Sequence, residues 1–417
     1  MPTRPALRFA PFLLGLAAAI LAPACTGPAA AAAEKTLILD VEAGGQDRVC
    51  TPVMVGLPGN VKQVHLTTDG KAVPCQVVDS RLCFILDDLV AGKTRTYRVT
   101  LGERGPAPRG VEMKQTEKTV AISVAGKPFT VYHFTNPKPA GHQLRRPYFW
   151  PVYGPDQTPM TRPWPLTDGP IPNNVAKDHP HHTSLWVAHG NVSGVDDWSI
   201  SGKAGWIVHR GFETVESGPV LGWFRERLDW TDRNKKPVMA ETRTVRVWNL
   251  PTDHRTIDLD LVFEAAYGKV KFGDTKEGGL CAARMRPEFR HDGKGGAKGR
   301  LVNSEGQTGK KAWGKKAEWV DANGPVAGKR FGFAIFDHPE NLRHPTTWHA
   351  RTYGLLTANP FGLSHFTRGK ENGDWTLAEG KTLRQRYRVT FHRGDEKDAN
   401  VAERYADWAD PPNASWK

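Results

Sequence analysis

The sequence predicts an all-β protein, in which a small N-terminal antiparallel β-sandwich is followed by a larger domain of two stacked antiparallel sheets. Two observations lead to this prediction. Short runs rich in β-branched and aromatic residues recur between turn residues along most of the chain. Several longer runs also alternate apolar with polar side chains, as in residues 256–263, TIDLDLVF. A convincing helical pattern is confined to residues 398–408.

The first domain is expected over residues 34–104, and its strands are expected at residues 36–41, 61–68, 75–78, 82–86 and 96–101. Gly, Pro and charged residues then interrupt the pattern over residues 102–110, as a linker would. The second domain is expected over residues 110–417. Its strands are expected at residues 119–124, 129–135, 205–215, 219–230, 239–248, 255–265, 331–336, 351–357 and 383–391. Antiparallel strands in this number favour two large sheets packed face to face.

Residues 1–33 are expected to form a signal peptide. Arg4 and Arg8 precede an apolar run over residues 9–21, which is too short to remain in a membrane as a spanning helix. Two cleavage sites stay open. A lipoprotein-type site would leave a lipid anchor at Cys25, whereas ordinary cleavage would occur before Glu34. Ordinary cleavage is slightly favoured, because the lipoprotein box is imperfect. The protein is therefore expected to be exported without a transmembrane segment, to the periplasm, the outer membrane or the medium.

Charge and cysteine content narrow the classes of partner. The formal net charge is +13, but Lys and Arg are spread along the chain and no fold signature of nucleic-acid binding is present. We therefore predict no nucleic-acid partner, and we interpret the charge as favouring solubility and the binding of acidic surfaces or anionic substrates.

Four cysteines follow the leader, and their pairing, including a bridge between Cys75 and Cys83, stays open. Their spacing does not predict a structural zinc site.

The densest chemical feature is the segment DHPHHTSLWVAH at residues 178–189, which holds four histidines. An imidazole can bind a metal or exchange a proton near physiological pH. The preceding segment RRPYFWPVY at residues 145–153 adds cations and flat apolar rings. A surface loop with scattered histidines is the alternative, but Pro180 stiffens the backbone, so we expect at least one histidine to be functional. Alternation would send His181 and His182 to opposite faces.

Two further regions carry polar groups of the kind found in sites. The turn GDTKEGG at residues 273–279 leads into a strand with Cys281 and Arg284, and it presents Glu277 beside Lys276. A carboxylate next to a cation suits a general base, although an ordinary exposed turn has the same composition. Residues 336–341, 348–354 and 359–362 concentrate His, Arg, Trp and Asn between strands, as the rim of a ligand site would.

Taken together, these motifs resemble the PmoA-like family, a group of exported bacterial proteins without an assigned activity. The resemblance is carried by RPY at residues 146–148, DHPHH at 178–182, LW at 185–186, TKEG at 275–278, DHP at 337–339, WHAR at 348–351 and NPFG at 359–362. The methane oxygenase suggested by the family's name is an integral membrane protein, so that activity is not expected here. The resemblance implies a carbohydrate setting, because such proteins tend to be encoded with sugar oxidoreductases and other carbohydrate-degrading proteins.

The expected architecture of the second domain also resembles the galactose mutarotase-like supersandwich, which sugar epimerases, hydrolases and lyases share. We therefore expect a β-supersandwich for residues 110–417. This comparison concerns the fold, and a fold alone does not determine a function.

The leading hypothesis is an exported carbohydrate-active enzyme, a hydrolase or lyase acting on a glycoside or an oxidised sugar. His182 and Glu277 are expected to be its acid and base. The residues expected to bind the carbohydrate substrate are Arg146, Tyr148, His179, His181, Trp186, Lys276, Arg284, His349, Arg351 and Asn359.

No cofactor or metal is predicted. Two alternatives stay open: a glycan-binding protein without catalysis, and a metal-dependent protein that uses His179, His181 or His182 with Glu277 or His349. The sequence leaves the identity of the sugar undecided, and it leaves hydrolase, lyase and epimerase chemistry undecided as well.

Overall fold

The computed structural model describes residues 35–251 and 253–417, and the predicted signal peptide and Cys25 lie outside them. Most regular structure in the described residues is β, which confirms the predicted fold class. The strands are β1 (Thr36–Glu42), β2 (Arg48–Gly56), β3 (Val64–Thr68), β4 (Lys71–Val73), β5 (Cys75–Val78), β6 (Arg81–Leu89), β7 (Thr94–Leu101), β8 (Val111–Gln115), β9 (Thr119–Val124), β10 (Lys127–His133), β11 (Tyr148–Val152), β12 (Leu185–His189), β13 (Trp206–Glu216), β14 (Leu221–Thr231), β15 (Pro237–Trp248), β16 (His254–Glu264), β17 (Val270–Phe272), β18 (Gly278–Arg284), β19 (Arg300–Asn303), β20 (Trp319–Val326), β21 (Lys329–Asp337), β22 (Leu355–Ala358), β23 (Trp375–Leu377), β24 (Thr382–Arg393) and β25 (Asn413–Trp416). The helices are α1 (Leu363–Phe366) and α2 (Val401–Ala409).

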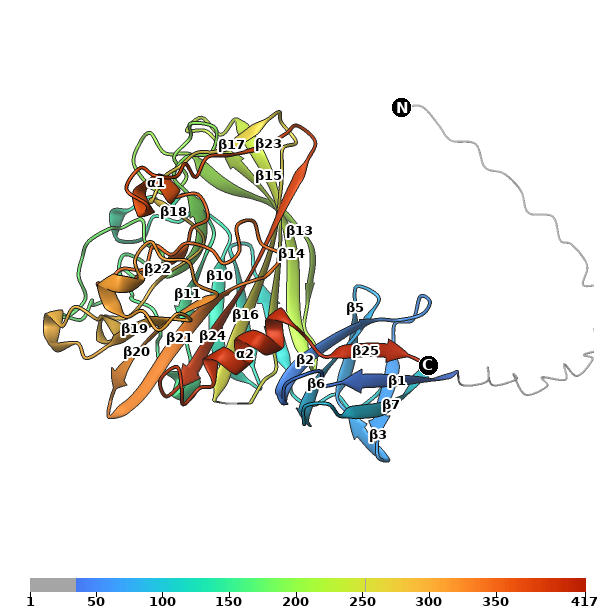
Figure 1. Cartoon of the computed structure of the whole chain (residues 1–417). Helices are drawn as coiled ribbons and strands as arrows, with labels where there is room; N and C mark the ends of the chain where they lie inside the picture. The colour runs from blue at the N-terminus through green and yellow to red at the C-terminus, as the bar shows by residue number, and fades with distance from the viewer. Residues whose placement is uncertain (1–34, 252) are drawn as a thin grey trace, which may run out of the picture. The chain divides into compact units, whose positions relative to one another are not determined.

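Two large antiparallel sheets form the main body (Figure 1). The seven-stranded sheet has the order β22-β18-β12-β11-β10-β9-β8, and the eight-stranded sheet has the order β13-β14-β15-β16-β24-β21-β20-β19. A large buried apolar cluster draws residues from both sheets. In β16, for example, Ile257, Leu259, Leu261 and Phe263 are buried in this core, as the alternation in the sequence predicts. Each large sheet therefore has an inner apolar face and an outer face.

A buried polar network crosses this core. Arg243 on β15 donates two hydrogen bonds to Glu241, at 2.7 and 3.0 Å, and a third, at 2.9 Å, to the hydroxyl of Tyr132 on β10. Tyr132 in turn bonds Glu226 on β14, and Trp230 donates to Glu241 at 2.6 Å. Because β10 belongs to the seven-stranded sheet and β14 and β15 to the other, the network links the two sheets. Partners of this kind offset the cost of burying charge.

The small sandwich contains residues from both ends of the described chain. Its sheets have the orders β25-β1-β7-β3-β4 and β2-β6-β5, and they enclose a separate apolar cluster. Strand β25 pairs with β1, with Trp416 opposite Leu39 (Figure 1). The boundary placed at residues 104–110 stays a prediction, but the pairing shows that residues far beyond it complete the first sandwich.

The four described cysteines, Cys50, Cys75, Cys83 and Cys281, are all free. Register explains why the local bridge does not form. Cys75 on β5 lies opposite Phe84, whereas Cys83 on β6 lies opposite Gln76. This offset of one residue sends the two thiols to opposite faces of the sheet, where they join different apolar clusters.

Several strands have no counterpart among the predicted ones. Strands β2, β11 and β20 each contain a proline, at positions 52, 151 and 325, and proline is unfavourable within a sheet. Every residue of β12 is buried, so its sequence shows no alternation. None of the helices in the described part of the chain is long and apolar enough to cross a membrane.

We predict that Arg243→Ala destabilises the protein by about 3–5 kcal/mol, because it leaves Glu241 buried without its cation. Arg227→Ala is the matched control. Arg227 lies on neighbouring β14, is exposed and pairs with Glu213, so its loss should cost about 0–1 kcal/mol. Urea unfolding of both variants measures the difference, and equal costs would contradict a stabilising role for the buried network.

Candidate functional site

A pocket of about 550 Å³ lies on the outer face of the seven-stranded sheet, beside the segments that follow β12 and precede β18 and β22. Alternation along these strands creates that face. Leu185 and Val187 enter the core between the sheets, whereas Trp186 and Ala188 join a second cluster outside it. The pocket is lined by His179, His181, Gly190, Asp196, Trp198, Ser199, Thr275, Lys276, Glu277, His349, Arg351 and Tyr353. Its volume is in the range of ~300–1,000 Å³ typical of small-molecule sites.

Two buried arginines hold the histidine loop in place. Arg162 donates to Asp178 Oδ1 at 2.6 Å and to the carbonyls of Asp178 and His179 at 2.8 and 2.9 Å. Arg284 of β18 donates to the same carboxylate oxygen at 3.0 Å. Burial and the adjacent Arg284 charge together lower the pKa of Arg162 to about 9, although Asp178 opposes both effects. The loop conformation is therefore tied to a carboxylate that neutralises two buried cations.

A third buried arginine joins this loop to the next one. The guanidinium of Arg146 donates to the carbonyls of His181, Asp197 and Trp198, at 2.8, 2.6 and 2.7 Å. Arg146 is fully buried and contacts only backbone oxygens there, so it acts on the pocket through the loops that carry His181 and Trp198. Five donors in a fixed fork make arginine suited to bridging several carbonyls.

The histidines of the loop form a stack of rings. His179 lies between Tyr353, at 5.5 Å and 11°, and His182, at 4.8 Å and 7°. His182 stacks in turn on Trp186 at 5.6 Å. The His182 ring is 1 % exposed and accepts a hydrogen bond from Arg284 at Nδ1. His181 meets His182 edge to face at 4.4 Å. The pocket therefore meets His179 and His181, while His182 lies beneath them.

The turn at residues 275–277 adds a carboxylate and a cation to the pocket wall. Lys276 pairs with Glu277, and the carbonyl of Lys276 accepts hydrogen bonds from His349 Nδ1 at 2.8 Å and from the amide of buried Asn359 at 3.2 Å. A Cβ at Gly190 would lie 2.3 Å from the carbonyl oxygen of Glu277, so only glycine permits this close approach. These contacts fix the position of Glu277.

Protonation states follow from these contacts. Burial, the largest single effect, raises the pKa of Glu277, but the hydrogen bond from Lys276 and the nearby basic groups together outweigh it, so the pKa lies below its ordinary value. Burial lowers the pKa of His349 to about 4, although the Glu277 charge opposes this. Because His349 Nδ1–H donates to a carbonyl, Nε2 carries the free lone pair. At neutral pH the pocket thus holds an ionised carboxylate and a neutral imidazole, both able to accept protons.

The structure brings six of the predicted residues to the pocket wall: His179, His181, Lys276, Glu277, His349 and Arg351. The other six do not line it: Arg146, Tyr148, His182, Trp186, Arg284 and Asn359. All six of these are buried, and four of them, Arg146, His182, Arg284 and Asn359, brace the loops that line the pocket or one another. The assignment of His182 as a catalytic group stays a prediction, although the residue is separated from the pocket by other rings.

Asp196, Trp198 and Ser199 also line the pocket but were not among the residues predicted from the sequence. Their segment, VDDWS at residues 195–199, lies between glycine-containing turns, and the pairing of acidic residues with a tryptophan was the available signal. Trp198 is 2 % exposed, and its indole N–H has no hydrogen-bond partner in the described structure. Together with Tyr353 it gives the pocket aromatic surface, while Asp196 adds a second carboxylate.

The metal-dependent alternative requires several ligands at one point. Among residues 35–251 and 253–417, no group of three or more His, Cys, Asp or Glu side chains is placed to hold a metal ion.

His189, the fourth histidine of the cluster, lies apart from the pocket. It is buried between the rings of Phe272 and Phe361, at 5.9 and 5.1 Å, and bonds the carbonyl of Gly273 at 2.9 Å.

Solved structures with a related arrangement of strands share little sequence with this chain. One, described as a protein in the glycosyl hydrolase family 38 from Enterococcus faecalis, has 8 % identity and a TM-score of 0.45, over 92 % of this chain and 47 % of that one. An alpha-mannosidase from Enterococcus faecalis V583 has 9 % identity and a TM-score of 0.42, over 92 % and 46 %. This chain thus spans about half the length of both.

A galactose mutarotase related enzyme from Lactobacillus acidophilus has 8 % identity and a TM-score of 0.30, over 68 % of this chain and 97 % of that one. No curated protein sequence matches the chain. The profile described as "Family of unknown function (DUF6807)" matches residues 119–407, which include every residue that lines the pocket. Because this match covers well over half of the sequence, the protein belongs to the DUF6807 family.

Proposed function

We propose that the protein is an exported carbohydrate-active enzyme that binds a saccharide in this pocket and removes a proton from it with Glu277. One observation carries the proposal: an ionised carboxylate, Glu277, and a neutral imidazole, His349, line the same pocket, whose walls also hold aromatic and cationic side chains. Membership of the PmoA-like family is part of this proposal. It is supported by the position of the motifs at residues 178–182, 275–278 and 348–351, which line or brace the pocket.

The composition of the walls suits a sugar. Tyr353 is part-exposed and offers apolar surface against which the C–H face of a sugar ring can pack, and the nearly buried Trp198 adds a small part of the same wall. Arg351 and Lys276 can donate hydrogen bonds to hydroxyl or carboxylate oxygens, and Asp196 can accept them.

The protonation states favour one class of reaction. Hydrolysis of a glycoside needs a protonated carboxylic acid with a raised pKa, whereas the pKa of Glu277 is lowered. An ionised carboxylate is instead ready to take a proton from the carbon next to a carboxylate or carbonyl group of an oxidised sugar. Lys276 and Arg351 can stabilise the negative charge that develops on that group. We therefore favour a lyase or epimerase acting on an oxidised sugar.

In the lyase case, the electron pair released from carbon forms a double bond and expels the glycosidic oxygen, which then needs a proton. Tyr353 can supply it. Burial raises the pKa of its hydroxyl, so the group is protonated at neutral pH, and its ring lines the pocket. In this reaction His349 orients the turn that carries Glu277, because it bonds the Lys276 carbonyl.

We predict that Glu277→Gln lowers turnover by about 10²–10⁴-fold, since the amide cannot accept the proton. Affinity for the substrate should change by only about 1–2 kcal/mol, the scale of one hydrogen bond to a charged group. The measurement is turnover of a panel of uronides, keto-glycosides and simple glycosides, with unsaturated products followed by ultraviolet absorbance. Glu213→Gln, which removes a carboxylate from β13 in the other sheet, is the control.

Unchanged turnover in Glu277→Gln would remove Glu277 from the mechanism. If no member of the panel is turned over and the variant only weakens binding, the protein is a glycan-binding module instead. Loss of turnover on addition of a chelator would support the metal-dependent alternative.

The pH profile gives a second prediction. A base acts in its deprotonated form, so its activity is present above its pKa and lost below it. Because the pKa of Glu277 lies below its ordinary value and that of His349 is about 4, kcat/KM should stay level from neutral pH into the mildly acidic range and fall only as the pH approaches about 4. A fall centred at ~6.5, the ordinary value for histidine, would contradict this. Circular dichroism at each pH checks that the protein stays folded.

A further inference from the structure

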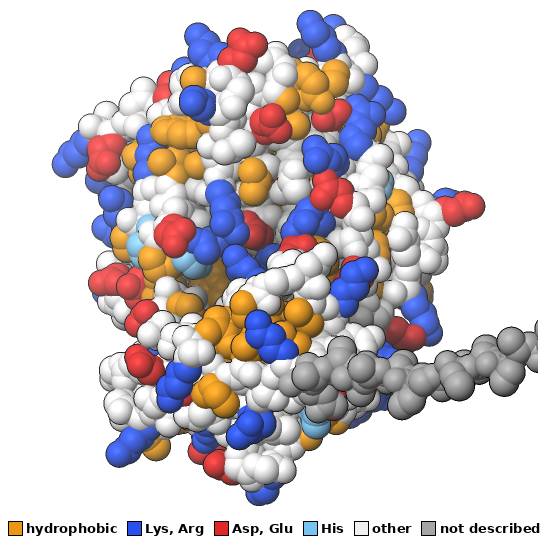
Figure 2. All heavy atoms as spheres, turned by 90° about the vertical axis from the view of Figure 1, so that its right-hand side faces the viewer, with side chains coloured by type: hydrophobic (Ala, Val, Ile, Leu, Met, Phe, Trp, Pro, Cys, Tyr) orange, Lys and Arg blue, Asp and Glu red, His pale blue; other side chains and the backbone are white. Residues whose placement is uncertain are grey.

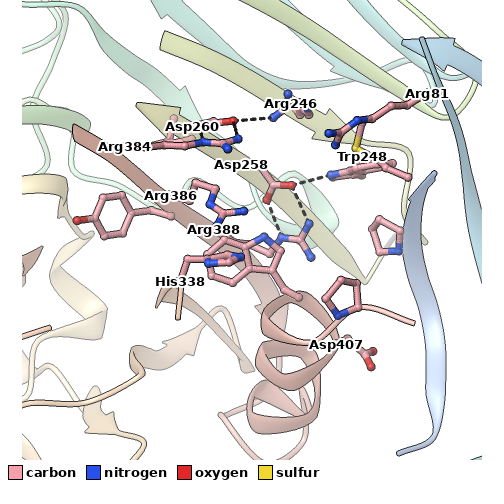
Figure 3. Close-up of a pocket in the computed structure, with 16 residues that line it drawn as sticks. Arg81, Arg246, Trp248, Asp258, Asp260, His338, Arg384, Arg386, Arg388 and Asp407 are labelled. Carbon is pink, nitrogen blue, oxygen red and sulfur yellow. Dashed lines mark hydrogen bonds and ion pairs between the residues drawn. The ribbon is translucent and has the colours of Figure 1, made fainter. Parts of the chain in front are cut away.

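A second concave region lies on the outer face of the eight-stranded sheet (Figure 3). It consists of two adjoining cavities of about 240 and 360 Å³, which we call the arginine groove. Both cavities are lined by Met54, Arg81, Arg246, Asp260 and Arg384. Strands β15, β16 and β24 form the floor of the groove, while β2 and β6 of the small sandwich and helix α2 form its sides. The pocket proposed above lies on the other large sheet.

Strand alternation places arginines along this floor. On β24, Leu383, Tyr387 and Val389 enter the core, and the residues between them, Arg384, Arg386 and Arg388, face the groove. Asp258 and Asp260 of β16 and Arg246 of β15 do the same on the neighbouring strands. The register sets Arg388 opposite Asp258, and Asp258 opposite Arg246. The sheet thus presents rows of alternating charge with arginine in excess.

All four aspartates that line the groove are already paired: Asp407 with Arg48, Asp79 with Arg225, and the two floor residues Asp258 and Asp260 with arginines of β24. Asp258 accepts two hydrogen bonds from Arg388, at 2.6 and 2.7 Å, and Asp260 accepts two from Arg384, both at 2.7 Å (Figure 3). Trp248 also donates to Asp258 at 2.8 Å. Bidentate pairs of this kind use most of the capacity of a carboxylate. The remaining cations of the groove therefore have few acceptors.

Three arginines are left with incomplete partners. Arg246 reaches Asp260 only at 3.6 Å, and its buried Nε has no hydrogen-bond partner in the described chain. Arg81 makes no ion pair with any described residue. Arg386 pairs with Glu340, whose side chain is 76 % exposed, and burial and the adjacent Arg384 lower the pKa of Arg386. A negatively charged ligand would relieve this excess of positive charge.

The remaining groups of the groove point to a sugar acid. Trp248 and Trp408 lie at one end, and Arg388 lies 5.6 Å from the ring centre of Trp408. The hydroxyls of Thr242 and Thr244 line the other cavity. An aromatic ring, hydroxyls and spaced cations match a chain of sugar rings that carry carboxylates. Figure 2 shows the side of the molecule that lies on the right in Figure 1, where Lys and Arg side chains gather near the middle beside acidic and hydrophobic ones.

We propose that the arginine groove is a second binding site, which holds an acidic oligosaccharide through its carboxylates. Arg81, Arg246 and Arg386 contact the carboxylates of the ligand, and the part-exposed Trp408 contacts one of its rings. The site is separate from the pocket that holds Glu277, so it binds whether or not that pocket is catalytic. Its role is to retain an acidic glycan chain on the protein.

The test compares binding of a tetragalacturonate and of an uncharged tetrasaccharide by isothermal titration calorimetry, with the full chain. The double variant Arg81→Gln/Arg386→Gln removes two cations without leaving a buried carboxylate unpaired, since Arg81 has no ion-pair partner in the described chain and Glu340 is exposed. Each substitution should cost about tenfold in affinity for the acidic probe. Arg227→Gln, on β14 and outside the groove, should change it less than about twofold.

Thermal unfolding of each variant confirms that it is folded. Tight binding of the acidic probe that falls about a hundredfold in the double variant, with weak binding of the uncharged probe, supports the proposal. Absence of binding overturns it, as does equal affinity for both probes or an unchanged affinity in the double variant. A single-stranded DNA of equal charge that binds as tightly, and with the same loss in the variant, assigns the groove to nucleic acid and also overturns it.

Discussion

The structure depends on one constraint: each large sheet must bury one of its faces, and the two sheets bury them against each other. Side chains alternate along a strand, so the residues between the core positions are sent to the outer faces. On the eight-stranded sheet this places Arg384, Arg386 and Arg388 on the outer face, and on the seven-stranded sheet it places Trp186 there. The inner faces can hold charged groups only when these are paired, as Arg243 is with Glu241 and Tyr132.

The pocket is built mostly by segments that are not strands, and buried arginines give them their shape. Arg146, Arg162 and Arg284 are almost completely buried, and their hydrogen bonds go largely to backbone carbonyls and to Asp178. A buried guanidinium without acceptors would be strongly unfavourable, so the loops must adopt conformations that present those acceptors. Arg146 and Asp178, which belong to the motifs at residues 146–148 and 178–182, thus act by positioning the residues of the pocket wall.

Long amphipathic strands could be predicted from the sequence because their period is visible. Strand β9 was predicted at its observed bounds, and β16 within one residue at each end. Strand β12 could not be found this way, since all of its residues are buried. In β2, Pro52 lies in an edge strand of its sheet, where proline is tolerated, but its presence weakens the sequence signal for a strand. The pairing of β25 with β1 joins residues nearly four hundred positions apart, which local patterns do not reveal.

The density of histidines at residues 179–189 correctly indicated where the pocket lies, but their spacing in the sequence did not show which of them line it. Four histidines lie within eleven residues, yet His179 and His181 line the pocket, His182 lies beneath them and His189 is in the apolar core. Alternation along a strand would have sent His181 and His182 to opposite faces of a sheet, yet their rings lie 4.4 Å apart. The reason is that His179 and Ser184 have positive φ, at 43° and 67°, so the segment between them is not an extended strand. Side-chain direction here depends on Arg146 and Arg162, which are distant in sequence, so only the folded structure could show which histidines reach a ligand.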